Sequence, residues 1–448
     1  MPDSSSPRIS RRNMLGMGLS LPLLGGLSAC RGAETGIATD GSADGKTQVT
    51  FWSSLRGSHE VVEAFNEAQD EIEVVFSQIP TGGEGGYAIL RNAARAGNAP
   101  DVITLEYPQL PGFVVDGIAQ DLTDLMDEGF RDSILPEALA RTTYEDRVYA
   151  IPNDLEPLVL HYRQDLFEEH GYEVPTTWEE FAELGRRIRG EQSGVRIANF
   201  ATNGGTYFAG FAQQAGGQWF ETRDDTWHVN MADEGTRRIA EFWQDLIDDD
   251  VVTIMADGDE FDAMLSRDRI LTRTSGAWDA GAQMSARPGQ SGLWRIAPLP
   301  QWEAGETSLG DHGGSTFTLT EDAKEPEAAM EFLEWMVSHP DSMRARLSAG
   351  TSSMFPVVEE MIDAARDVFD DSYYGGQDIY TLFAEEAPKV RDDWNWGPRM
   401  TATLQVMQDN FARVPATDDT LIDAIRAAQG GTVPDLRALG LSVSEHQG

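Results

Sequence analysis

Near the start of the folded chain, short apolar runs alternate with segments in which apolar residues recur at helical spacing. Each change of pattern predicts a new strand or helix. Short apolar runs at 48–52, 72–76 and 101–105 have the length of buried strands. Between them, residues 59–69 and 87–96 place apolar side chains at helical spacing. This alternation of strands and helices predicts a parallel sheet covered by helices, and ligands bind such sheets at the carboxyl ends of the strands.

The pattern changes at residues 148–162, which are apolar and extended. Pro152 and Pro157 interrupt this stretch, and a central strand would not tolerate two prolines. We therefore predict that it crosses between two lobes. Beyond it the chain is mostly helical, with a few strands. We expect a helix at 181–189 opened by a capping box at Thr177, helices at 233–248 and from Pro326, and strands at 270–274 and 315–319.

The N-terminal residues differ from the rest of the chain. An apolar run at 14–27 follows Arg11 and Arg12 and leads to the string Leu27-Ser28-Ala29-Cys30, which contains the only cysteine. The run is shorter than the roughly 20 residues that a membrane-spanning helix needs. It resembles a twin-arginine export signal joined to a lipobox, which predicts that residues 1–29 are removed and that Cys30 is lipidated. Export by the Sec route and a free, buried cysteine are the alternatives.

Composition and charge bear on both organisation and partners. Residues 30–47 are rich in Gly, Ala, Ser and Asp, which predicts a flexible linker. The roughly 400 residues that follow exceed one hydrophobic core, so at least two lobes are expected. The 75 acidic residues outnumber the 34 basic ones and give a formal charge of −41. Such a surface disfavours nucleic acid and anionic lipid as partners, and is typical either of a saline habitat or of an ordinary acidic exported protein.

Nine short motifs occur in an order and at a spacing that resemble the extracellular solute-binding proteins of family 1. These proteins are the maltose-binding-type sugar receptors of ABC importers. The resemblance extends from about residue 48 to about residue 430. The motifs are Phe51–Ser54, Pro100–Ile103, Tyr149–Asp154, Tyr162–Phe167, Pro175–Phe181, Gly216–Gly217, Trp278, Gly313–Ser315 and Glu327–Phe332.

The resemblance implies an α/β fold of the periplasmic-binding-protein type, with two discontinuous lobes joined by three hinge crossings that close on a ligand. We expect residues 48–152 and 282–314 in lobe 1, residues 153–281 and 315–448 in lobe 2, and crossings near 152–157, 276–282 and 313–317. It also implies a monomeric receptor without cofactor or enzymatic activity. The receptor would capture a sugar, most simply an oligosaccharide, and present it to ABC permease subunits from outside the cytoplasm, where its N-terminal lipid holds it to the membrane.

The chemistry of sugars indicates which residues form the site. Aromatic rings pack on the C–H faces of a pyranose, and charged or amide groups bind its hydroxyls. From the strand ends and the first crossing we predict Ser53, Ser54, Arg56, Glu106, Tyr107 and Asp154. Positions matched to the family add Tyr207, Trp278, Asp279, Trp394, Trp396 and Arg399. The tryptophans on apolar faces, namely Trp52, Trp178, Trp243 and Trp335, are expected in the core.

Two other functions remain open at this point. A receptor of the same fold could bind a polyamine, a peptide or another solute. A secreted glycoside hydrolase would need a pair of carboxylates, and the acidic residues are too numerous for any pair to stand out. No metal is expected, because no two histidines are four residues apart and no second cysteine occurs. The chain also contains no Gly-x-Ser-x-Gly motif of serine hydrolases.

Overall fold

The computed structural model describes residues 45–348, 350 and 352–445. The predicted export signal, Cys30 and residues 30–44 of the predicted linker lie outside the described residues. Within the described part of the chain, no helix is long and apolar enough to cross a membrane.

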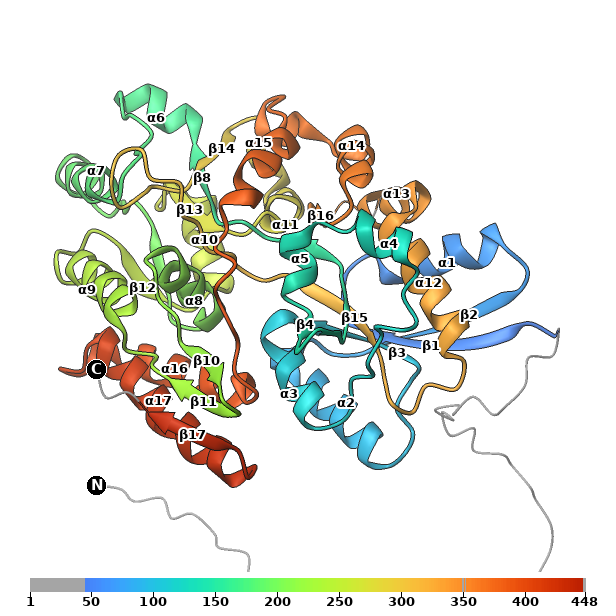
Figure 1. The fold of residues 1–448 in the computed structure, drawn as a ribbon. Helices are drawn as coiled ribbons and strands as arrows, with labels where there is room; N and C mark the ends of the chain where they lie inside the picture. Colours follow the sequence, from blue (N-terminus) through green and yellow to red (C-terminus); the bar gives the residue numbers. More distant parts are fainter. Residues whose placement is uncertain (1–44, 349, 351, 446–448) are drawn as a thin grey trace, which may run out of the picture. The chain divides into compact units, whose positions relative to one another are not determined.

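A five-stranded sheet forms the first half of the fold, with the strand order β2-β1-β3-β15-β6 (Figure 1). Strand β1 pairs in parallel with β2 and β3, as the alternating pattern predicts, and β15 pairs antiparallel with β3. Helices α1 and α2 connect the three parallel strands. The bounds are β1 Thr47–Ser53, α1 Ser58–Ala68, β2 Ile72–Gln78, α2 Gly86–Arg95, β3 Val102–Glu106, β6 Ile151–Pro152 and β15 Ser315–Leu319.

Phe51 of β1 lies at the centre of the core beneath this sheet and is fully buried. Its ring contacts those of Phe76, Phe317 and Phe332 at centroid distances of 5.6–5.9 Å. Phe317 comes from β15, and Phe332 comes from α12 (Pro326–Ser338). The core therefore joins strands near the start of the chain to a strand and a helix almost 300 residues later.

A second group of elements surrounds a three-stranded antiparallel sheet with the order β13-β8-β14. A smaller parallel pair, β9 and β12, lies in the same group. Trp178 and Trp243 are fully buried in its aromatic core, as predicted, whereas Trp52 and Trp335 pack half-buried against other core clusters. The elements are β8 Val159–Arg163, α6 Gln164–His170, α7 Trp178–Glu191, β9 Asn199–Ala201, α8 Gly205–Gln214, α9 Glu234–Asp248, β12 Thr253–Met255, β13 Thr272–Ser275, β14 Trp294–Pro298, α16 Met400–Phe411 and α17 Leu421–Ala438.

The remaining helices and strands connect these two groups or pack against them. They are α3 Leu110–Val115, α4 Glu128–Ser133, α5 Pro136–Ala140, β4 Thr143–Tyr144, β5 Arg147–Val148, β7 Asp154–Leu155, β10 Phe220–Arg223, β11 Thr226–Val229, α10 Asp259–Ser266, α11 Asp279–Ala286, α13 Pro340–Ser348, β16 Phe355–Pro356, α14 Glu359–Val368, α15 Ile379–Glu386 and β17 Ser442–Glu445.

Strand pairing differs from the predicted lobe boundaries at two places. The segment 315–319, expected in lobe 2, is β15 and pairs with β3 and β6 of the five-stranded sheet. The segment 282–314, expected in lobe 1, contains β14, which pairs with β8. The pairing partner of a single strand lies far away in the sequence, so local pattern does not reveal it.

Two of the three predicted crossings coincide with passages between the sheets. The chain passes from β6 to β8 through residues 153–158 and returns to the five-stranded sheet at β15. The predicted crossing at 276–282 is wrong, because the strands on either side of it, β13 and β14, both pair with β8. The short strand β7 within the first crossing pairs instead with β16.

Replacing Phe51 by alanine tests the core beneath the five-stranded sheet. Phe51→Ala should lower the free energy of unfolding by about 3–5 kcal/mol, because it removes a fully buried ring and leaves a cavity among three others. Urea denaturation followed by circular dichroism measures the change. Ile89→Ala on α2 is the matched control, since Ile89 is 40% exposed. Equal losses in the two variants would contradict the packing described here.

Candidate functional site

A cavity of about 310 Å³ opens where the two groups of elements and the crossing segments meet. Small-molecule sites in proteins start at about this size. Strands β1 and β3 contribute the residues that follow their carboxyl ends, which is where a parallel sheet binds ligands. The lining consists of Ser54, Leu55, Arg56, Thr81, Glu106, Pro108, Asn153, Asp154, Glu156, Thr206, Trp278, His312, Gly313, Gly314, Ser315, Arg346, Ser352 and Met354.

The carboxylate of Asp154 holds together the chain segments at the base of this cavity. It accepts hydrogen bonds from the backbone N–H of Ser315 at 2.6 Å and from Nδ2 of Asn153 at 2.9 Å. Arg346 Nη1 donates in turn to Oδ1 of Asn153 at 2.6 Å. These residues come from the first crossing, from the start of β15 and from α13, so one network fixes three distant segments of the chain.

Burial changes the acid–base behaviour of these groups. It raises the pKa of Asp154 to about 6, although the hydrogen bonds from Ser315 and the charge of Arg346 act in the opposite direction. Burial also raises the pKa of Glu156 well above its usual value, and the nearby Asp154 adds to this rise. The same desolvation lowers the pKa of Arg346 to about 10. The cavity therefore combines two reluctantly ionised acids with one buried cation.

Two buried polar atoms of this lining lack a hydrogen-bond partner among the described residues. They are Oε1 of Glu156, whose side chain is 1% exposed, and Nη2 of Arg346, whose side chain is 3% exposed. Leaving such groups unpaired costs about 1–3 kcal/mol each, so native structures rarely do so without a reason. One atom is an acceptor and the other a donor. The arrangement suits a ligand group that can both donate and accept.

Trp278 forms one wall of the cavity, and both of its N–H groups are already engaged. Its backbone N–H donates to Oε2 of Glu156 at 2.5 Å, and its indole Nε1 donates to the carbonyl of His312 at 2.8 Å. Gly313 lies against the edge of the ring, where a Cβ would come 3.0 Å from Nε1. The side chain is half-buried. Its orientation is therefore fixed by the protein while part of the ring stays accessible.

Gly314 allows the crossing segment to lie against Tyr107. Its φ is +84°, and a Cβ at this position would approach the Tyr107 ring to 2.6 Å. The hydroxyl of Tyr107 donates to the backbone carbonyl of Asp154 at 2.9 Å. Only glycine combines this backbone conformation with this close approach. Tyr107 thus supports the base of the cavity from behind and does not line it.

Five of the predicted site residues line the cavity: Ser54, Arg56, Glu106, Asp154 and Trp278. Glu106 is exposed at the end of β3, and the protein atoms around its carboxyl group partly desolvate it and raise its pKa. The strand-end rule and the first crossing account for four of these five residues, and the family resemblance accounts for Trp278.

Four other predicted residues have partners elsewhere. Ser53 is buried and accepts a hydrogen bond from Thr104. Tyr107 supports Asp154, as described above. Tyr207 is buried, and its hydroxyl is hydrogen-bonded to that of Thr274. Asp279 is buried in an ion pair with Arg273 at 2.6 Å.

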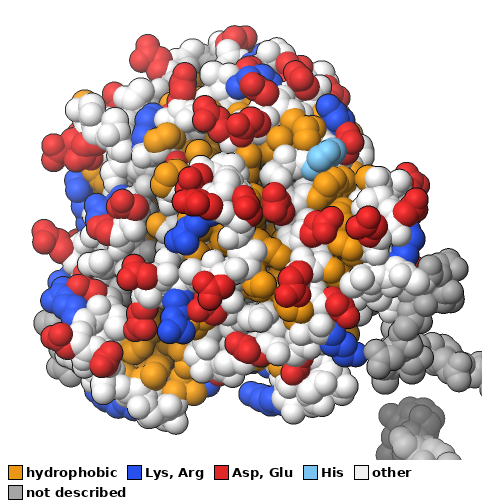
Figure 2. All heavy atoms as spheres, turned by 45° about the vertical axis from the view of Figure 1, so that its right-hand side comes forward, with side chains coloured by type: hydrophobic (Ala, Val, Ile, Leu, Met, Phe, Trp, Pro, Cys, Tyr) orange, Lys and Arg blue, Asp and Glu red, His pale blue; other side chains and the backbone are white. Residues whose placement is uncertain are grey.

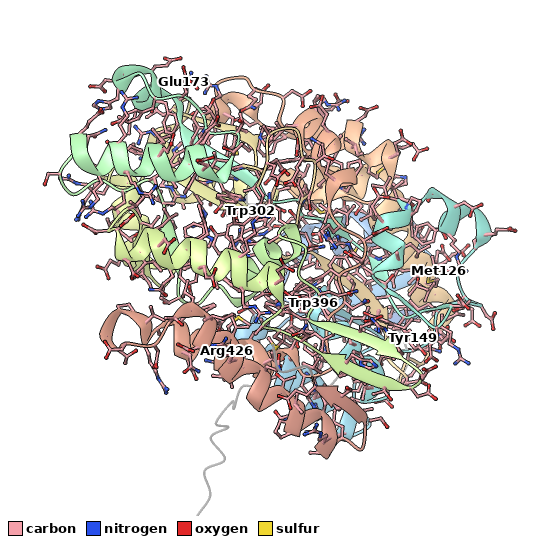
Figure 3. All side chains as sticks on the ribbon, turned by 60° about the vertical axis from the view of Figure 1, so that its left-hand side comes forward. Met126, Tyr149, Glu173, Trp302, Trp396 and Arg426 are labelled. Atoms are coloured by element: carbon pink, nitrogen blue, oxygen red, sulfur yellow. The ribbon has the colours of Figure 1, made fainter. Side chains whose placement is uncertain are left out.

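Trp394, Trp396 and Arg399 do not line the cavity either. The rings of Trp394 and Trp396 pack on each other and on Trp219, with centroid distances of 5.0–6.5 Å. Figure 3 shows Trp396 close to the β10–β11 hairpin. Arg399 approaches Asp116 at 3.7 Å. A segment rich in aromatic residues, glycine and charged residues can thus pack against other elements and need not bind a ligand.

Sequence reasoning missed several lining residues, of which Arg346 is the most informative. It lies on α13, two residues after Arg344, which is exposed. Helical spacing alone does not tell which of the two points inward, because the helix has only a weak apolar face. Glu156, two residues after Asp154, lines the cavity as well.

Comparison with known proteins gives a consistent result. The family model of the bacterial extracellular solute-binding proteins matches residues 52–343. A lactose-binding protein of Rhizobium radiobacter is 25% identical over 250 residues, which are 54% of this chain and 58% of that protein. The alignment thus spans less than two thirds of that relative. A galactooligosaccharide-binding protein of Bacillus subtilis is 22% identical over 70% of this chain and 74% of its own length.

Among solved structures, the chain is similar to the galacto-N-biose/lacto-N-biose I-binding protein of an ABC transporter from Bifidobacterium longum, determined in complex with lacto-N-biose. The two are 26% identical, with a TM-score of 0.80, over 91% of this chain and 100% of that chain. This likeness confirms the predicted α/β fold of the periplasmic-binding-protein type.

The raised pKa of Asp154 predicts how stability depends on pH. A carboxyl group that binds its proton more tightly in the folded state loses folding stability as the pH rises. Between about pH 4 and pH 7, the free energy of unfolding of the wild type should therefore fall by about 2 kcal/mol relative to Asp154→Asn.

Urea denaturation at four pH values across this range measures the difference between wild type and variant. Asp363→Asn, at a side chain that is 80% exposed, controls for the loss of one carboxylate. A difference between wild type and Asp154→Asn that does not change with pH would contradict the assignment.

Proposed function

Because the chain belongs to the family of bacterial extracellular solute-binding proteins, we propose that it captures a sugar in the cavity and delivers it to an ABC importer. Relatives and structural neighbours that bind lactose, galactooligosaccharides and lacto-N-biose support a sugar, and specifically an oligosaccharide, as the ligand. The partners would be the permease subunits of that importer, and the receptor would act as a monomer without chemical turnover of its ligand.

The observation that carries this proposal is that Glu156 Oε1 and Arg346 Nη2 are both buried without a hydrogen-bond partner among the residues that the structure describes. A hydroxyl group both donates and accepts, so the hydroxyls of a sugar could satisfy both atoms. A cation would satisfy only the carboxylate, and an anion only the guanidinium. Hydrogen bonds from charged groups are the stronger ones, so a bond from the guanidinium of Arg346 would contribute substantially to affinity.

The other lining residues fit the same ligand class. The half-buried ring of Trp278 offers an apolar face for the C–H groups of a pyranose. Ser54 and Arg56, which follow β1, and Glu106, the last residue of β3, supply further donors and acceptors in the same lining. A site that joins one aromatic platform to several polar groups is the usual arrangement for a neutral, hydroxyl-rich ligand.

A polyamine is the alternative ligand that a specific observation favours. Three carboxyl groups, those of Glu106, Asp154 and Glu156, line the cavity. Two arginines, Arg56 and Arg346, lie in the same lining and would repel an ammonium group. The acidic residues that Figure 2 shows across the surface would attract cations to the protein without selecting one at this site.

We further propose that the N-terminal region exports and anchors the receptor. Lipidation of Cys30 would hold the binding domain at the outer side of the membrane, near its permease, and the Gly- and Ala-rich linker would let it reach that partner. Cys30→Ser should move the protein from the membrane fraction to the soluble fraction of cells, as measured by immunoblotting. Retention of the variant in membranes would contradict the anchor.

Ligand titration tests the proposed function directly. Adding mono- and oligosaccharides to the purified domain should change the tryptophan fluorescence, because Trp278 lies in the lining. Chromatography after a long incubation should show no product. Hydrolysis of any glycan would favour the glycoside hydrolase instead, and a response to spermidine without a response to any sugar would favour the polyamine receptor.

Arg346→Met should weaken sugar binding by about 10- to 100-fold, since it removes a buried charged donor. Arg344→Met is the matched control, because Arg344 lies on the same helix, is 58% exposed and pairs with Asp341. Isothermal titration calorimetry measures both affinities. If Arg346→Met does not fold, Glu156→Gln tests the same pair with little change of shape. Unchanged affinity in the folded variants would overturn the assignment of this couple.

A further inference from the structure

Outside the cavity, helix α3 touches the residues that lead into α16. Leu110 and Phe113 place α3 in a core that it shares with β3, so this helix belongs to the group around the five-stranded sheet. Met400 and Leu404 place α16 in the core of the second group. The contact between the two helices therefore spans the two groups.

The two backbones come close together at this contact. A Cβ added to Gly112 of α3 would lie 2.5 Å from the carbonyl oxygen of Pro398 and 2.9 Å from the flexible end of Arg91. Nearby, Thr401 Oγ1 donates a hydrogen bond to Oε1 of Gln109 at 2.5 Å. The approach of the two backbones thus depends on a residue without a side chain at position 112.

The charge of Asp116, which follows α3, lies between arginines of both groups. Its carboxylate is 2.8 Å from Nε of Arg91 in the first group and 3.7 Å from Nη2 of Arg399 in the second. Residues 45–152 and residues 158–312 each contain more acidic than basic residues, so the two groups repel each other. The attraction between Asp116 and Arg399 offsets part of this repulsion, and it is screened less than on an open surface because Asp116 is only 18% exposed.

The contact coexists with a cavity that both groups line. Ser54 and Glu106 come from the first group, and Thr206 of α8 and Trp278 come from the second. If the groups moved apart, the two sides of this lining would separate and the contact would break. The contact therefore belongs to the closed arrangement of the molecule.

We propose that the contact of residues 109–116 with residues 398–401 is a latch that holds the two groups closed around the ligand. This inference rests on the proposed function and adds where affinity is set outside the cavity. A ligand that needs the closed arrangement binds more weakly when that arrangement is less populated. None of Gln109, Gly112, Asp116 and Thr401 lines the cavity, so weakening the latch lowers the affinity for every ligand by the same factor.

Gly112→Leu tests the latch by steric hindrance and leaves every charge in place. The new side chain would meet the backbone of Pro398, whereas leucine itself suits the interior of a helix such as α3. Gly190→Leu on α7 is the matched control, because a Cβ added to Gly190 has no neighbouring atom within 4 Å. Thr401→Val is a second variant, which removes the hydroxyl that donates to Gln109 from an exposed position.

The probes are lactose, maltose and lacto-N-biose, titrated by calorimetry after circular dichroism has shown that each variant is folded. Gly112→Leu should weaken every sugar that binds the wild type by about tenfold or more, and by the same factor within about twofold. Thr401→Val should weaken them by about two- to tenfold, the worth of one hydrogen bond. Stopped-flow tryptophan fluorescence should show that sugar dissociation accelerates by a similar factor, and Gly190→Leu should change neither quantity.

Two outcomes would overturn the latch while leaving the proposed function intact. One is unchanged affinity for every sugar in both folded variants. The other is a loss for one sugar and not for another, because the contact would then act as a wall of the binding site. A wild-type protein that responds to no sugar at all would instead overturn the proposed function, and the inference with it.

Discussion

The hydrogen-bonded carboxylate of Asp154 is the interaction on which the rest of the site depends. It accepts from the backbone of Ser315 and from Asn153, and Asn153 in turn accepts from Arg346. The strand that contains Asp154 also pairs with β16, so a fourth segment joins the same point. In a buried environment each of these bonds is strong, and each unpaired group is costly. The network therefore sets the positions of segments that have no other reason to meet.

The placement of charge follows the same logic. The chain carries a formal charge of −41, yet two of its basic residues, Arg56 and Arg346, line the cavity. Arginine suits such positions because its planar guanidinium can bind several acceptors at once and keeps its charge when buried. The acidic surface and the mixed lining thus have separate roles. The first affects solubility and distant attraction, and the second decides which ligand fits.

The residues that line the cavity were predictable to different degrees. Strand ends and the first crossing led to Ser54, Arg56, Glu106 and Asp154, because the rule for parallel sheets depends only on local alternation of elements. Positions matched to the family predicted Trp394 and Trp396 in the site, whereas the structure packs them on Trp219. Trp278, which lines the cavity, and the pair Trp394 and Trp396, which does not, all stand close to glycine and charged residues in the sequence. Composition therefore does not tell whether a tryptophan binds a ligand or packs against other elements.

The sequence by itself determined the elements near the start of the chain, their parallel order and the family to which they are similar, since hydrophobic period and motif order are local properties. Only the tertiary structure decided which strands pair across the crossings and which arginine of α13 is buried. It also decided that Glu156 and Arg346 each keep one atom without a partner in the described part of the chain. Those outcomes depend on contacts between residues that are more than a hundred positions apart. Local pattern contains no information about such contacts, and packing and desolvation settle them.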